Sequence, residues 1–125
     1  MEYKQIDIKK GIKLHTINTE KFKTNLIAVM LTTKLDPKNV TKNALIPAVL
    51  RRGTQNLKTL EEINKKLEDM YGASLDCGLD KTGDNQVLKF YIESVNDKFL
   101  PQNSENILEN SLENIFELVF NPYLE

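Results

Sequence analysis

The chain has 125 residues, 40% of them apolar, and its 17 basic and 18 acidic side chains leave a formal net charge of -1. That apolar share can form a buried core, so we expect one folded domain over residues 1–125. The even charge balance argues against a nucleic-acid partner and against binding to an anionic membrane. The longest apolar run, Leu26–Leu31, is far shorter than the roughly 20 residues that cross a bilayer.

The N-terminus and the cysteine content bear on location. The first ten residues alternate charge with Ile6 and Ile8 and lack the apolar stretch of an export signal. Cys77 is the single cysteine, so an internal disulfide is excluded. A chain of this kind is typical of a reducing compartment, and we expect a cytoplasmic location.

The N-terminal part of the chain predicts strands. Residues 3–8 and 12–17 alternate apolar and polar side chains around Lys10-Gly11, which predicts a β-hairpin. Residues 25–33 are apolar almost without a break, and this pattern predicts a strand that is covered on both faces. Asp36-Pro37 then turns the chain.

A first helix is expected over about residues 40–52. One of its faces carries Leu45, Ala48, Val49 and Arg52. Pro47 lacks an amide hydrogen and crowds the preceding turn, so we expect the helix to start close to Pro47 or to kink near Asn43.

A second helix begins with a capping box. The Thr59 hydroxyl is expected to accept the amide of Glu62, while the Glu62 carboxylate reaches back to the start of the helix. Gly72 lies just after the last turn, at the position where a helix commonly ends with a left-handed backbone conformation. The spacing predicts a buried stripe composed of Ile63, Leu67, Met70 and Tyr71.

The last part of the chain predicts two strands and a helix. A half-buried strand is expected from the alternation of Ala73, Leu75, Cys77 and Leu79 with polar residues. A turn at 83–85 leads into a second strand, 86–95. We expect Ser104 to cap a final helix that ends at Asn121-Pro122. Its apolar side is expected to consist of Leu108, Leu112, Ile115, Phe116 and Val119.

These elements define the order β-β-β-α-α-β-β-α. Strands clustered before and after helices favour an α+β domain, in which helices pack on a mostly antiparallel sheet.

Five short strings in this order carry a resemblance to a known family. They are Lys10–Leu14 in the hairpin, Arg51–Thr54 after the first helix, the capped helix Thr59–Tyr71, the strand Gly72–Gly78, and Leu118–Tyr123. Their order and spacing resemble the N-terminal half-domain of the pitrilysin, insulinase and mitochondrial processing peptidase family of zinc peptidases. The resemblance covers nearly the whole chain and implies the LuxS/MPP-like metallohydrolase fold. It also implies that this chain is the N-terminal fragment of a longer protein.

This sequence departs from the active members of that family at the metal site. Active members carry His-x-x-Glu-His just before the Gly-Thr string; the histidines bind zinc and the glutamate activates the metal-bound water. Counting back from Gly53-Thr54, the two histidine positions hold Ala44 and Ala48, and the glutamate position holds Pro47. None of these side chains can bind zinc or accept a proton, and catalytic zinc needs about three protein ligands. We therefore expect no catalytic residue, no metal ligand and no cofactor here, whereas the resemblance implies zinc in active relatives.

Two other reactive side chains have plainer interpretations. His15 is the only histidine, and nothing near it in sequence has ligand spacing, so we interpret it as a surface residue of the hairpin. Cys77 lies on the apolar face of its strand and is expected to pack as a small hydrophobic residue. As a nucleophile it would need a histidine partner, for which His15 is the sole candidate.

The resemblance also implies a peptide-binding edge. In active relatives the substrate adds as an extra strand beside the segment that corresponds to Ala73–Leu79. Strand addition uses backbone groups, so it can persist without catalytic side chains. The candidate edge strand consists of Ala73, Ser74, Leu75, Asp76, Cys77, Gly78 and Leu79. The alternative is that a part of the protein outside this chain covers the edge.

Three functions stay open at this point. The favoured one is a non-catalytic homologue of a zinc metallopeptidase, which holds peptide or acts as the partner of an active peptidase subunit. The second is a fragment of an active zinc metalloendopeptidase whose metal site lies outside residues 1–125. The third is a stand-alone interaction module, for which the resemblance describes the fold alone. The expected protein partner is an active peptidase homologue or the rest of the same chain.

Overall fold

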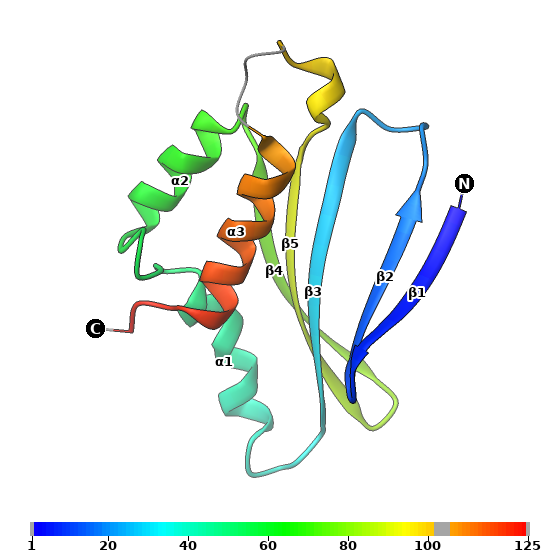
Figure 1. The fold of residues 1–125 in the computed structure, drawn as a ribbon. Helices are drawn as coiled ribbons and strands as arrows, with labels where there is room; N and C mark the ends of the chain where they lie inside the picture. Colours follow the sequence, from blue (N-terminus) through cyan, green and yellow to red (C-terminus); the bar gives the residue numbers. More distant parts are fainter. Residues whose placement is uncertain (1, 102–105, 125) are drawn as a thin grey trace.

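Helices cover one face of an antiparallel sheet in the computed structural model, which describes residues 2–101 and 106–124 (Figure 1). The elements in chain order are β1 (Glu2–Lys9), β2 (Ile12–Asn18), β3 (Thr24–Lys34), α1 (Val40–Leu50), α2 (Leu60–Asp69), β4 (Ser74–Thr82), β5 (Asn85–Val95), the short 3-10 helix η1 (Asp97–Phe99) and α3 (Ile107–Phe120). The predicted α+β class and element order are confirmed, and η1 is an addition. Within the described ranges, none of the helices has the length and apolar character needed to cross a bilayer.

The strands form two separate sheets rather than one. β1 pairs with β2, and the other three strands are ordered β3-β5-β4, with all neighbours antiparallel. β5 is therefore the central strand, and β3 and β4 both lie at edges. The predicted N-terminal hairpin is confirmed, and Gly11 in its turn has a left-handed φ of 82°.

β3 is covered on one face only, so the prediction of a strand covered on both faces is wrong. Ile27, Val29 and Leu31 pack against the core below the helices. On the opposite face, Leu26 is 63% exposed and Met30 is 55% exposed. The unbroken apolar run therefore reflects two apolar faces, of which only one is buried within the described part of the chain.

The core lies between the helices and the inner face of the β3-β5-β4 sheet. Phe90 and Ile92, at the centre of β5, are almost completely buried. Burying side chains of this size stabilises a fold by roughly 1.5–3 kcal/mol each. Among the described residues, the buried apolar set consists of Ile63, Leu67, Met70, Ala73, Leu75, Leu88, Phe90, Ile92, Ile107, Ile115, Leu118 and Val119.

α1 runs without a break from Val40 to Leu50, so the expected helix start close to Pro47 is wrong, and the alternative, a kink near Asn43, stays a prediction. Hydrogen bonding continues after the proline, since the Arg51 amide donates to the Pro47 carbonyl at 3.1 Å. Pro47 is the buried residue of this helix, and its burial offsets part of the roughly 3 kcal/mol that a mid-helix proline costs. The face with Leu45 and Val49 is exposed to solvent.

α2 begins with the predicted capping box. The Glu62 amide donates to the Thr59 hydroxyl and the Thr59 amide donates to the Glu62 carboxylate, both at 3.1 Å. Two consecutive left-handed residues then end the helix, Tyr71 with φ 59° and Gly72 with φ 74°. Because Tyr71 has left the helical path, its side chain is 55% exposed. Its assignment to the buried stripe is therefore wrong, whereas Ile63, Leu67 and Met70 are buried as predicted.

α3 is rotated relative to the expectation. Its N-cap is Asn106, which accepts the Glu109 amide, while the predicted cap, Ser104, lies outside the described residues. Leu108 and Phe116 are 39% and 47% exposed, so their assignment to the buried side is wrong. The buried face consists of Ile107, Ser111, Ile115, Leu118 and Val119. Ser111 can be buried because its hydroxyl bonds that of Ser94 on β5 at 2.8 Å.

Candidate functional site

The positions that correspond to the zinc-ligand pattern lie on α1. Ala44 and Ala48 are exposed to solvent, whereas Pro47 is buried. None of the three carries a side-chain donor atom for a metal. Over residues 2–101 and 106–124, no three or more His, Cys, Asp or Glu side chains gather as a metal ion would need. That the chain holds no zinc stays a prediction.

The direction of the backbone groups in the sheet follows from two hydrogen bonds at its ends. The Leu35 amide donates to the Asp84 carbonyl at 2.9 Å, and the Asn96 amide donates to the Lys23 carbonyl at 2.8 Å. In an antiparallel ladder, hydrogen-bonded pairs alternate with non-bonded pairs. The register therefore places odd-numbered residues of β3 and even-numbered residues of β5 in bonded pairs.

The same alternation defines the free edge of β4. The odd-numbered residues of β5 bond to β4, and their β4 partners are Ser74, Asp76, Gly78, Asp80 and Thr82. The odd-numbered residues of β4 then direct their N–H and C=O groups away from β5. This outward set is Leu75, Cys77, Leu79 and Lys81. The candidate peptide-binding strand is thus an edge strand, paired on one side with β5 among the described strands.

One outward amide of β4 already has an acceptor. The Cys77 amide donates to the carboxylate of Asp76 at 2.9 Å. A carbonyl from an added strand would have to replace that carboxylate. The sequence offered no firm signal for this contact, because it depends on Cys77 facing an open edge.

Charged side chains flank the outer face of β4. Lys89 on β5 forms an ion pair with Asp80, and this hydrogen bond raises the pKa of Lys89. Gly78 lies between Asp76 and Asp80, and among the described residues beyond its two chain neighbours no atom lies within 4 Å of the position that a Cβ would take there. Charges on an edge strand discourage indiscriminate pairing with other chains.

Cys77 lies on the inner face of the strand and is half-buried. Burial raises the pKa of its thiol above the usual 9.0, while the positive charge of Arg51 opposes that rise. His15 belongs to the other sheet, where it is exposed and hydrogen-bonded to the Tyr3 hydroxyl. The structure therefore does not bring Cys77 and His15 together in one strand pair.

Two of the strings that carry the family resemblance meet in space. The Thr54 segment forms a bridge with Pro122, and the Gln55 amide donates to the Asn121 carbonyl at 3.0 Å. The Tyr123 amide donates in turn to the Gly53 carbonyl at 3.1 Å. These backbone contacts join the loop after α1 to the end of α3. We call this pairing of residues 53–55 with residues 121–123 the clasp, and its role is structural.

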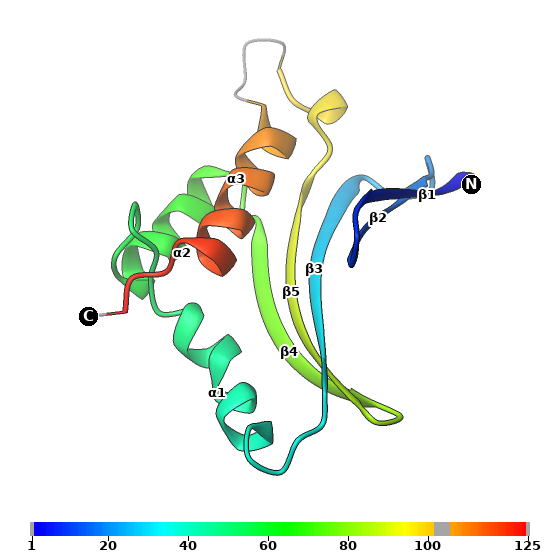
Figure 2. The same cartoon turned by 60° about the horizontal axis from the view of Figure 1, so that its bottom comes forward.

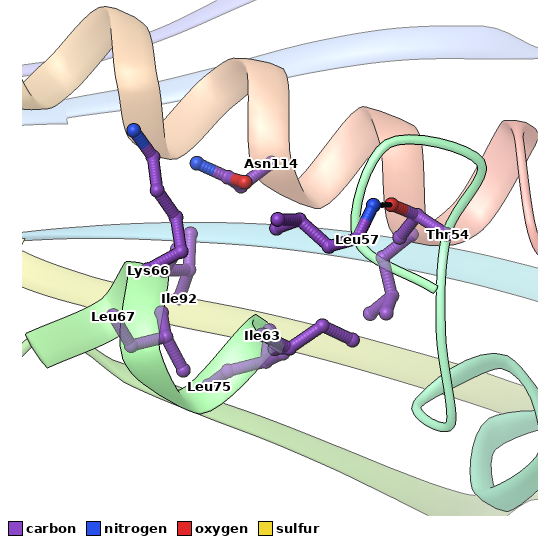
Figure 3. Close-up of a pocket in the computed structure, with 9 residues that line it drawn as sticks. Thr54, Leu57, Ile63, Lys66, Leu67, Leu75, Ile92 and Asn114 are labelled. Carbon is purple, nitrogen blue, oxygen red and sulfur yellow. Dashed lines mark hydrogen bonds between the residues drawn. The ribbon is translucent and has the colours of Figure 1, made fainter. Parts of the chain in front are cut away.

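A small cavity lies behind this clasp (Figure 3). Its volume is about 10 Å³, room for roughly one water molecule. Figure 3 shows Thr54 and Leu57 at one end, joined by a 2.9 Å hydrogen bond, with Asn114 of α3 alongside. A space of this size holds neither a peptide nor a cofactor.

The fold and the sequence both have known counterparts. Over 115 residues, 92% of its length, the chain is 37% identical to a Bacillus subtilis (strain 168) protein named "Probable inactive metalloprotease YmfF". A crystal structure of a conserved protein from Enterococcus faecalis V583 matches 98% of the chain with a TM-score of 0.92 and 27% identity. The chain spans only 27% and 28%, respectively, of these longer proteins. No protein-family model matches the chain.

The comparisons identify the class of protein. This chain shares its α+β fold with the Enterococcus protein, and it is a homologue of a probable inactive metalloprotease. Its assignment to the pitrilysin and insulinase family stays a prediction.

Proposed function

We propose that this chain is a non-catalytic, metallopeptidase-like unit that holds peptides as an added strand along the free edge of β4. The observation that carries the proposal is the outward direction of the backbone groups of Leu75, Cys77, Leu79 and Lys81. An extended peptide can pair with such a row by main-chain hydrogen bonds alone. The homology to a protein named a probable inactive metalloprotease supports the non-catalytic part, as do Ala44, Pro47 and Ala48 in place of zinc ligands and base.

The side chains beside the edge suggest which peptides fit. Side chains of an added strand on the outer face would lie next to Asp76 and Asp80, which favours basic residues there. Side chains on the inner face would lie next to Cys77 and Leu79, the latter 41% exposed, which favours apolar residues. The best ligand is thus an extended peptide in which basic and apolar residues alternate.

Other parts of the same proposal follow from the resemblance. They are membership of the pitrilysin and insulinase family, a cytoplasmic location, and a protein partner that is an active homologue or the rest of a longer chain. A fragment of an active metalloendopeptidase and a stand-alone module remain the alternatives. Zinc analysis of a longer protein that contains residues 1–125 separates the first of these from the proposal, because its metal site would lie outside residues 1–125. One zinc per chain that survives dialysis, with hydrolysis of a fluorogenic peptide, would contradict the non-catalytic assignment.

The peptide-holding part is tested with a ten-residue peptide of alternating Lys and Leu and a matched peptide of alternating Glu and Leu. NMR should show shifted and slowly exchanging amides at Leu75, Cys77 and Leu79 with the Lys peptide only. Cys77→Pro removes an outward amide and should abolish capture while the fold persists. Gly78→Pro removes an amide that bonds to β5 and should unfold the strand. Unchanged amide exchange along 73–79 at saturating peptide would refute the proposal.

A further inference from the structure

The second free edge of the sheet belongs to β3. Because odd-numbered residues of β3 bond to β5, its even-numbered residues direct N–H and C=O groups away from β5. The central outward residues are Leu26, Ala28, Met30 and Thr32. This edge faces the side of the sheet where the β1–β2 hairpin lies (Figures 1 and 2). The hairpin forms its own sheet and does not pair with β3.

The two edges of the sheet differ in how they are protected. β4 carries Asp76, Asp80 and Lys81 along its nine residues. β3 is 11 residues long and has neither a charge nor a proline before Lys34. A long, apolar, unguarded edge strand is an association hazard that folded proteins avoid by covering the edge. The composition of β3 is therefore that of an interior strand, although it has one strand neighbour in the described part of the chain.

Within residues 2–101 and 106–124, nothing covers the hairpin beside β3 either. Its large apolar side chains are between 43% and 61% exposed, and they are Tyr3, Ile6, Ile8, Ile12, Leu14 and Ile17. A two-stranded hairpin of this kind is marginally stable by itself in water. The link from β2 to β3 has five residues, 19–23. Such a link easily spans the roughly 9–10 Å between two strands that are separated by one further strand.

We propose that an extended segment of a longer polypeptide inserts between β2 and β3 and joins the two sheets into one. The segment would be apolar on both faces, because it would lie beside Ile27 and Val29 on the inner face and beside Leu26 and Met30 on the outer face. We assign this segment to the same polypeptide, because the chain matches only 27% and 28% of two longer proteins. A tethered segment is present at a high effective concentration. This inference is independent of peptide holding at β4.

The test compares the 125-residue chain with a chimaera in which residues 1–125 replace the matched segment of the Bacillus subtilis relative. Hydrogen exchange at Leu26, Ala28, Met30 and Thr32 should be at least tenfold slower in the chimaera than in the isolated chain. The tether keeps even a weak contact between the two parts measurable. Slow exchange at Phe90, in the core, verifies that both proteins are folded.

Proline variants test the direction of the backbone groups. Ala28→Pro removes an outward amide, so the isolated chain should stay folded while the chimaera loses its protection at Leu26 and Met30. Ala28→Thr keeps the amide and should retain the protection. Val29→Pro breaks a bond to β5 and should unfold both proteins.

Three outcomes would overturn the proposal. One is equal exchange at the β3 edge in the chimaera and the isolated chain. The second is protection in the isolated chain with the mass of two chains by light scattering, which would make a second copy the occupant. The third is protection of Leu26 and Met30 by the alternating Lys–Leu peptide, which would make β3 a peptide site. Capture of that peptide at Cys77 and Leu79 tests the proposed function separately.

Discussion

Gly53 offers a sharp test of the clasp between the loop after α1 and the end of α3. Its φ is not left-handed, unlike those of Gly11, Gly72 and Gly83, so an alanine there is not strained by a positive φ. A Cβ on Gly53 would nevertheless lie 2.4 Å from the Lys58 carbonyl oxygen and 2.8 Å from its carbon. Both are backbone atoms, so no side-chain rotation can relieve the clash.

The magnitude follows from what must move. The 54–58 loop is held by the Thr54 amide on the Leu57 carbonyl at 2.7 Å and by the Leu57 amide on the Thr54 hydroxyl at 2.9 Å. Loss of one such bond costs about 1 kcal/mol, and forced overpacking costs roughly 1–3 kcal/mol. Alanine also lowers the conformational entropy of the unfolded chain, which stabilises the folded state by about 0.5–1 kcal/mol. Gly53→Ala should therefore destabilise the fold by about 1–3.5 kcal/mol.

Gly78→Ala is the matched control. No described atom beyond its two chain neighbours lies within 4 Å of its Cβ position, so the substitution should be neutral or stabilise β4 by up to about 1 kcal/mol. Urea unfolding followed by circular dichroism measures both variants, and an unchanged m-value shows that the unfolded state is comparable. If the two variants differ by less than about 0.5 kcal/mol, the assigned clash at Gly53 is wrong.

Three further predictions concern single contacts. Ser111→Ala should cost about 1–3 kcal/mol in urea unfolding because it leaves the buried Ser94 hydroxyl unpaired; the double variant with Ser94→Ala should lose less. Thr59→Ala should cost about 1 kcal/mol by removing the α2 cap. Burial raises the pKa of Cys77, so iodoacetamide at pH 8.5 should modify it more slowly than free cysteine, and Arg51→Gln should slow it further. Because burial raises the pKa of Cys77, the unfolded chain loses this thiol proton at a lower pH than the folded chain does. The contribution to folding stability is therefore complete below pH 9 and should be lost as the pH rises above 9.

The features that could be predicted from sequence are those with local causes. The turn at Lys10-Gly11 and the Thr59 capping box depend on residues within a few positions of each other, and both are confirmed. The buried face of α3 was misassigned because it depends on a distant partner. Ser111 is buried only because Ser94 lies opposite it on another element.

The candidate site was also predictable from sequence only in part. The absence of donor atoms at Ala44, Pro47 and Ala48 is readable from the sequence alone. The free edge of β4 is not, because it depends on the strand order β3-β5-β4 and on which amides face β5. The contact between the Cys77 amide and the Asp76 carboxylate follows only from that order.

The three substituted positions on α1 differ in how readily they could regain a metal site. Ala44 and Ala48 are exposed and one helical turn apart, so histidines there would be solvated and could bind zinc from one side. Pro47 is buried, and a glutamate in its place would put a carboxylate into the apolar interior, which raises its pKa and disfavours the charged base. We expect the variant with Ala44→His, Pro47→Glu and Ala48→His to bind zinc weakly, with two ligands, and to hydrolyse no peptide. Zinc titration and a fluorogenic peptide assay measure both, and peptide hydrolysis that depends on added zinc would show that residues 1–125 already hold the rest of a catalytic site.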